Sequence, residues 1–164
     1  MSESAPRLRS PRERVSPRAR LMWMCTDLLR SVPPMALLLL ATGPWHWFDL
    51  PTWCLVAIGV LFVAYGLLVP LWRYQVHRWE VTDTAVYTQT GWWARERRIA
   101  PMSRVQTVDH REGAIARLFG LATVRVTTAS SAGALTIEGL DQQRALAIVE
   151  DLTRMADSVP GDAT

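Results

Sequence analysis

The sequence predicts a membrane-anchored α+β fold, in which a two-span transmembrane helical hairpin is followed by an antiparallel β-barrel or sandwich capped by a C-terminal helix. Three observations predict it. Residues 51–72 contain no charged side chain. Tryptophans stand near the ends of two apolar segments. Further along, short β-rich runs lead into one amphipathic helical stretch. Together these features exclude a single soluble globule of 164 residues.

A basic arm, residues 1–16, opens the chain, and we expect it to lie in the cytoplasm. Residues 1–20 hold six Arg and two Glu, whereas residues 73–164 hold eleven Arg and eleven Asp or Glu. Nucleic-acid-binding proteins usually carry their basic surface on the folded domain. Because the downstream domain is neutral overall, we expect no nucleic-acid partner.

The transmembrane hairpin is predicted over residues 17–72, with spans at about 24–45 and 51–72. As a helix, the uncharged segment 51–72 would be about 33 Å long, which matches a hydrocarbon core of about 30 Å. A buried core helix of this length would normally carry a polar stripe, and this segment has none. We therefore predict that it spans the membrane.

The first span is less uniformly apolar, but the sequence still supports a long helix. Ser16 is a suitable N-cap and Pro17 suits the first helical position. A kink is expected near Pro33, where a second proline follows. Asp27 and Arg30 are spaced to pair across one helical turn.

Tryptophans at the ends of the spans are predicted to anchor the hairpin at the two lipid–water interfaces, where aromatic side chains gather. They are Trp23, Trp45, Trp47, Trp53 and Trp72. Arg residues flank the hairpin on both sides, whereas the turn at 43–50 contains none. The positive-inside rule therefore predicts a multi-pass protein of the plasma (inner) membrane, with both termini in the cytoplasm.

Two other interpretations of the first segment stay open. A cleaved signal peptide fits poorly, because the basic region is long and no small-residue cleavage site precedes the next apolar run. An interfacial first helix is the stronger alternative. It would reverse the second span and place residues 73–164 outside the cytoplasm.

Residues 73–156 are predicted to form the β-rich domain, and residues 157–164 a flexible tail. Short β-rich runs, with breaks at Gly, Pro and Asp, predict strands at 76–82, 85–90, 92–100, 105–110, 122–128 and 134–138, and the run at 122–128 alternates fully.

Helical and turn segments complete the predicted domain. A helical turn is expected at 113–120 and a tight turn at 130–133. Asp141 can N-cap an amphipathic helix that runs to about Ala156. One helix closing the open end of a curved antiparallel sheet is the layout of pleckstrin-homology (PH)-like barrels.

Four stretches of the sequence carry a resemblance to a family. They are WEVT and YTQTG within 79–91, RRIAPMSRVQTV at 97–108, ARLFGLATVRVTTA at 116–129 and IEGL at 137–140. Together they resemble the YdbS-like bacterial PH-domain membrane proteins, over roughly residues 16–156. The resemblance implies a two-span anchor and one PH-like module, and it implies assembly with related proteins, because some relatives carry several such modules.

No arrangement of residues predicts catalysis, and we expect no enzyme, cofactor, metal site or small-molecule substrate. His46, His77 and His110 lack the spacing of metal ligands. Cys25 and Cys54 are too few for a disulfide framework, and we expect both to be small buried apolar residues.

Arginines near the membrane are the candidate binding residues, for lipid headgroups or for a partner. They are Arg73, Arg78, Arg95, Arg97 and Arg98. Each Arg close to an anionic surface contributes about 1 kcal/mol of attraction. The alternative is a solvated strand face. Phosphoinositide binding is not expected, because the first hairpin loop of the domain, Asp83–Thr84, is short and acidic.

Adjacent tryptophans, Trp92 and Trp93, should point to opposite faces of a strand, one of them inward. The predicted function is a non-catalytic cytoplasmic binding or scaffolding module, held at the bilayer and assembling with protein partners. Related PH-like membrane proteins are the candidate partners. The alternatives are an anionic-lipid-sensing module and an accessory subunit of a transport or envelope-stress complex.

Overall fold

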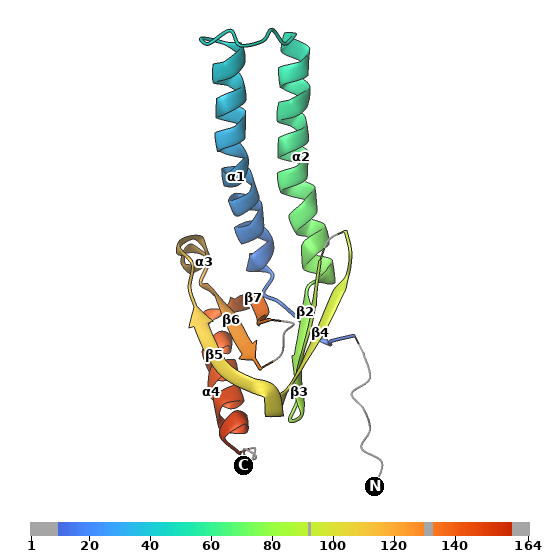
Figure 1. Ribbon diagram of the computed structural model, residues 1–164, viewed down its shortest axis with the longest axis vertical. Coiled ribbons are helices and arrows are strands. Elements are labelled where there is room, and N and C mark those ends of the chain that lie inside the picture. The colour runs from blue at the N-terminus through green and yellow to red at the C-terminus, as the bar shows by residue number, and fades with distance from the viewer. Residues whose placement is uncertain (1–9, 92, 130–132, 159–164) are drawn as a thin grey trace.

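Two long helices rise from one end of a small β-sandwich, as Figure 1 shows. The structure, a computed structural model, describes residues 10–91, 93–129 and 133–158. Helix α1 (Arg18–Thr42) and helix α2 (Thr52–Val76) form the hairpin, and each is 25 residues long. Both are long and apolar enough to cross a membrane. The predicted hairpin and its order before the β-rich domain are confirmed.

The helices pack side by side, and α1 runs without a break through its two prolines. They pack closely at Gly66 of α2, where an added Cβ would come within 2.7 Å of Leu28 Cδ2. Asp27 and Arg30 pair as predicted, with 3.9 Å between Oδ1 and Nη1. Most of the large apolar side chains along the hairpin are exposed, as a lipid-facing surface requires.

The base of the hairpin differs from the prediction at two points. Ser16 does not cap α1 through its side chain; Pro17 holds the N-cap position, and Ser16 Oγ donates to Asp141 Oδ1 over 3.0 Å. Helix α2 continues to Val76, so the next strand begins at Arg78 rather than at Val76. A helical hydrogen bond from His77 N to Arg73 O, 2.8 Å long, holds that last turn.

The sandwich consists of a four-stranded and a three-stranded antiparallel sheet, and it does not close into a barrel. The first sheet has the order β1 (Glu13–Arg14), β2 (Arg78–Val81), β3 (Ala85–Thr90), β4 (Glu96–Pro101). The second has the order β5 (Val105–Arg111), β6 (Leu121–Thr128), β7 (Leu135–Asp141). The single turn η1 (Met102–Arg104) links the sheets.

Two helices complete the domain. Helix α3 (Ala114–Leu118) lies between β5 and β6, and helix α4 (Gln142–Ser158) packs on the second sheet. The predicted C-terminal helix is confirmed and runs two residues further than expected. Strand β4 starts at Glu96, later than the predicted 92–100. The predicted turn lies outside the described residues at 130–132, as does the predicted tail at 159–164.

The basic arm contains a strand that the sequence analysis did not predict. Glu13 pairs with Trp79 and Arg14 with Arg78, so β1 extends the first sheet from before the hairpin. The hairpin is therefore inserted between the first and second strands of the sheet. The Asp83–Thr84 loop joins β2 and β3 and, because α1 and α2 separate β1 from β2, it is the first β-hairpin loop along the chain, as expected.

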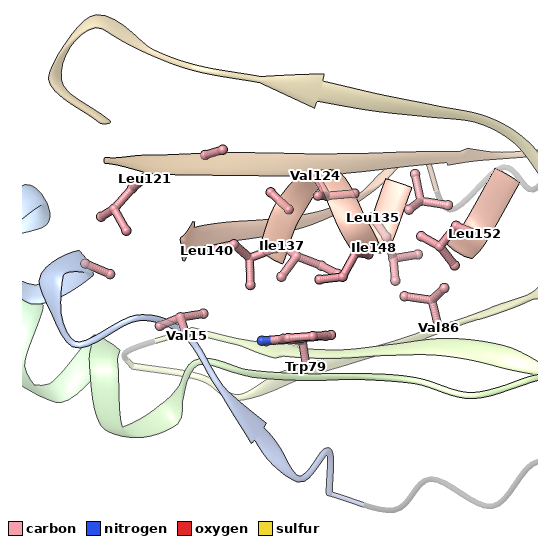
Figure 2. Packing of buried hydrophobic residues seen from close by; sticks show 14 of the residues in the cluster. Val15, Trp79, Val86, Leu121, Val124, Leu135, Ile137, Leu140, Ile148 and Leu152 are labelled. Atoms are coloured by element: carbon pink, nitrogen blue, oxygen red, sulfur yellow. The ribbon is translucent and has the colours of Figure 1, made fainter. Parts of the chain in front are cut away.

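One apolar core fills the sandwich, and Figure 2 shows side chains from both sheets and α4 pointing into it. Alternation in β6 works as predicted, since Ala122, Val124 and Val126 are fully buried. Two further contributions come from before the domain: Val15 beside β1, and the first turns of α1 through Ala19. The hairpin is thus built into the core rather than tethered to it.

Candidate functional site

The joint between hairpin and sandwich brings together residues from α1, α2 and β7. Gly139 of β7 lies against α1 with φ +74°, and an added Cβ would come within 2.6 Å of Ala19 Cβ. Its carbonyl accepts a 2.8 Å hydrogen bond from Ser16 N. Only glycine adopts this conformation without strain while allowing so close an approach. The joint is therefore tightly packed.

Trp23 lies inside this joint, with only 3% of its surface exposed. Its ring centroid is 5.3 Å from that of His77, and the Arg73 guanidinium carbon lies 4.4 Å above the ring. Arg73 Nη2 also donates to Glu138 Oε2 over 2.8 Å. Trp23 therefore lies in the core instead of at the lipid–water interface, and its ring contacts Arg73 in the joint.

His77 is buried beside this stack, and its Nδ1 has no hydrogen-bond partner among the described residues. Burial, and to a lesser extent the positive charge of Arg73, lower the pKa of His77 from 6.5 to about 4. The imidazole is therefore neutral at physiological pH. His77 forms no ion pair with any described residue, and its contact with Trp23 makes it a packing residue of the joint.

The five candidate arginines divide between two pockets. Arg73 and Arg98 line a pocket of about 450 Å³ at the foot of the hairpin, where acids balance them. Arg98 Nη2 lies 2.7 Å from Glu96 Oε1, and Arg73 is paired with Glu138. Both cations are therefore neutralised within the protein.

The other three arginines line a second pocket of about 320 Å³, next to the end of α2. They are Arg78, Arg95 and Arg97. The described lining of this pocket contains no acidic residue. The first pocket is electrically balanced, whereas this one is positive, a difference that the sequence alone did not reveal.

A short hydrogen-bond chain holds the floor of the positive pocket. Arg97 Nε donates to Gln89 Oε1 over 3.0 Å, and Gln89 Nε2 donates to the Val76 carbonyl over 3.0 Å. Arg97 Nη2 also reaches Ser10 Oγ, 3.1 Å away. These partners are neutral, so they fix the guanidinium while leaving its charge uncompensated.

The remaining predicted anchors lie on the hairpin surface. Trp45 and Trp47 stack in the loop between the helices, with ring centroids 4.9 Å apart. Trp53 begins α2 and is exposed, and Trp72 near its other end is half exposed. These positions suit the two interfaces, and their anchoring role stays a prediction.

Trp93 lies on the surface, with 88% of its surface exposed. Trp92 lies outside the described residues. Trp93 sits across a shallow apolar groove of about 630 Å³ from Leu68, Leu71 and Trp72 of α2. Sequence reasoning placed one tryptophan of the pair on the surface but did not connect it with α2.

Reactive side chains are scattered over the described part of the chain. No group of three or more His, Cys, Asp or Glu is placed there to hold a metal ion. His110 Nε2 lies 3.7 Å from Glu112 Oε1 at the end of β5, away from both pockets. Cys25 is exposed and Cys54 half-buried on the hairpin, so the expectation that both are buried was wrong.

Comparisons with known proteins agree with this architecture. The family model described as "Bacterial PH domain" matches residues 29–156, well over half of the chain. The UPF0699 transmembrane protein YdbS of Bacillus subtilis (strain 168) is similar, with 25% identity over 150 residues, 89% of this chain and 93% of the relative. No solved structure gives a significant match. The family match begins within α1, so β1 lies outside it.

Proposed function

This chain belongs to the bacterial PH domain family and is a membrane protein similar to YdbS, and from this premise we propose that it is a non-catalytic binding module that assembles proteins at the bilayer. The observation that carries the proposal is the insertion of the hairpin into the sandwich. Strand β1 before the hairpin pairs with β2 after it, and Val15, Ala19 and Trp23 enter the core. A domain held this way keeps a fixed orientation at the membrane, as a platform for partners requires.

The side of the membrane is part of the proposal. The Arg residues flanking the hairpin favour the cytoplasm for the domain and both termini, in the plasma (inner) membrane of the cell. Two exposed apolar side chains support seating on the lipid surface. Trp93, beside α2, and Leu118, on α3 close to α1, are 88% and 85% exposed. Figure 1 shows both segments at the end of the sandwich from which the helices rise.

Strand β5 is the partner surface that we propose. It pairs only with β6 among the described strands, so its other edge has no strand partner among them. Gln106, Thr107 and Asp109 on this strand are exposed. An open edge binds an extended segment of another protein by adding a strand to the sheet.

The experiment is site-specific photo-crosslinking in living cells with the full-length protein. A photoreactive residue at Asp109 probes the edge of β5, and one at Leu37 probes the first span. We expect the same protein partner to be captured reproducibly from Asp109 and not from Leu37. Crosslinks from Leu37 alone would instead support the accessory-subunit alternative, in which the spans make the contacts.

Turnover provides the second test. If the purified protein converted a substrate, and that conversion disappeared on changing a polar residue of the sandwich, the non-catalytic proposal would be wrong. The residues to change are His110 and Glu112, whose side chains lie close together at the end of β5.

A further inference from the structure

The positive pocket next to α2 contains charge that the protein does not neutralise. Arg78, Arg95 and Arg97 form no ion pair within the described residues, and every described polar neighbour of the pocket is neutral. Three guanidinium groups around a space of about 320 Å³ repel one another. Such a cluster is stabilised by a bound anion, and guanidinium groups suit phosphate because they donate paired hydrogen bonds.

An apolar groove continues from this pocket toward the membrane. It lies between Trp93 and the face of α2 that carries Leu68 and Leu71, and it shares Trp72 and Gln75 with the positive pocket. Figure 1 shows the β3–β4 connection rising beside the last turns of α2. From Leu68 to Gln75 the helix advances about 10 Å, roughly the depth from headgroup to upper acyl chain.

We propose that this composite surface binds an anionic glycerophospholipid of the adjacent leaflet. The phosphate lies among Arg78, Arg95 and Arg97, and an acyl chain follows the groove between Trp93 and Leu68. Charge complementarity selects an anionic headgroup, and the membrane-side groove selects a lipid over a soluble phosphate. The inference rests on the proposed membrane anchoring of the domain, but it requires no protein partner.

The test uses the full-length protein purified in a neutral detergent. Phosphatidylglycerol or phosphatidylcholine is added, and native mass spectrometry measures the lipid retained. We expect preferential binding of phosphatidylglycerol. Combining R78Q, R95Q and R97Q should weaken that binding by about tenfold or more. A matched control removes three exposed arginines elsewhere, R104Q, R111Q and R154Q, and should bind as the unchanged protein does.

Two further measurements separate a lipid site from a simple anion site. Trp93→Ala should weaken retention of phosphatidylglycerol several-fold, and millimolar glycerol phosphate should compete poorly. If glycerol phosphate displaced the lipid fully and Trp93→Ala had no effect, the site would bind only phosphate and the proposal would be overturned. Equal loss in the matched control, or equal binding of phosphatidylcholine, would overturn it too.

A single substitution keeps the test valid if the triple variant does not fold. Arg95→Gln changes an exposed side chain with no described hydrogen bond or ion pair, and it should weaken binding about fivefold. Unchanged binding would count against the site. Lipid retention does not depend on the crosslinks from β5, so the two proposals can fail separately.

Discussion

Gly139 is a residue at which the hairpin and the sandwich pack tightly against each other. It has φ +74° and lies in the IEGL motif by which the sequence resembled its family. We predict that Gly139→Ala lowers the free energy of unfolding by about 2 to 4 kcal/mol, because it adds backbone strain and a clash with Ala19 Cβ. Denaturant unfolding of the detergent-solubilised protein measures this effect.

Gly113 provides the control for that experiment. Its φ is −69°, and an added Cβ would meet nothing within 4 Å. Gly113→Ala should therefore change the free energy of unfolding by less than about 0.5 kcal/mol. Equal effects at the two positions would show that the tight contact at Gly139 does not hold the joint.

His77 links the stability of the joint to pH. Burial beside Trp23, with Arg73 nearby, lowers its pKa from 6.5 to about 4. Below pH 6.5 His77 binds a proton in the unfolded chain, whereas in the folded protein it binds this proton only at about pH 4. Stability from this group is therefore complete above pH 6.5 and falls as the pH drops, by about 3 kcal/mol in total.

Unfolding measured from pH 7 to pH 4.5 tests this prediction. His77→Gln should show a shallower loss of stability over that window than the unchanged protein. His46→Asn, in the loop between the helices, should keep the full loss, and asparagine tolerates the φ of +48° at that position. Identical slopes for His77→Gln and the unchanged protein would contradict the assigned pKa.

Among the secondary-structure elements, strand β1 gives the N-terminal arm a structural role that the sequence did not predict. As a free basic arm, residues 1–16 would contribute nothing to stability. In the structure Val15 is 2% exposed and packs in the core next to β1. Val15→Ala should therefore lower the free energy of unfolding by about 1 to 2 kcal/mol, whereas exposed Arg14→Ala should have little effect. No change in stability for Val15→Ala would contradict a structural role of this part of the arm.

The same elements show what the sequence could and could not predict. Strand β6 and helix α4 have clear periodicity over six or more residues, and β3 is a β-rich run between turn residues; the predicted positions of all three are confirmed to within two residues. Strand β1 has two residues, too few for any alternation, and its partner is more than sixty positions away. Long-range pairing of this kind leaves no local signal.

The sequence predicted which arginines belong to the candidate site but not how they are arranged. Arg73 and Arg78 were selected because they follow the second span, and Arg95, Arg97 and Arg98 because they form a charged run; all five line pockets near the end of that span. Their division into paired and unpaired charges depends on Glu138, contributed by β7, and on which face of β4 each side chain takes. The predicted position of Trp23 was wrong for a related reason. Its distance along the helix from Trp45 fits an aromatic belt, but the strand β1 holds the start of α1 in the core.

For the whole molecule, the pairing of β1 with β2 constrains the membrane topology. Glu13 and Trp79 lie on either side of the hairpin in sequence, and they face each other in one sheet. A sheet cannot form across a bilayer, so both segments need the same side of the membrane. That requirement conflicts with an interfacial α1 beside a spanning α2. It favours two crossings, with the charge rule assigning the common side to the cytoplasm.

Cysteine labelling tests this arrangement in full. In a background with Cys25→Ser and Cys54→Ser, we place one cysteine at Asp49, in the turn between the helices, or at Asp109, on the exposed face of β5. A membrane-impermeant maleimide should label D49C in intact spheroplasts, and should label D109C only after lysis. The reverse pattern would put the sandwich outside and contradict the cytoplasmic orientation. Labelling of both sites before lysis would mean that the hairpin does not cross the membrane. It would contradict the proposal that the hairpin holds a binding module at the cytoplasmic face of the bilayer.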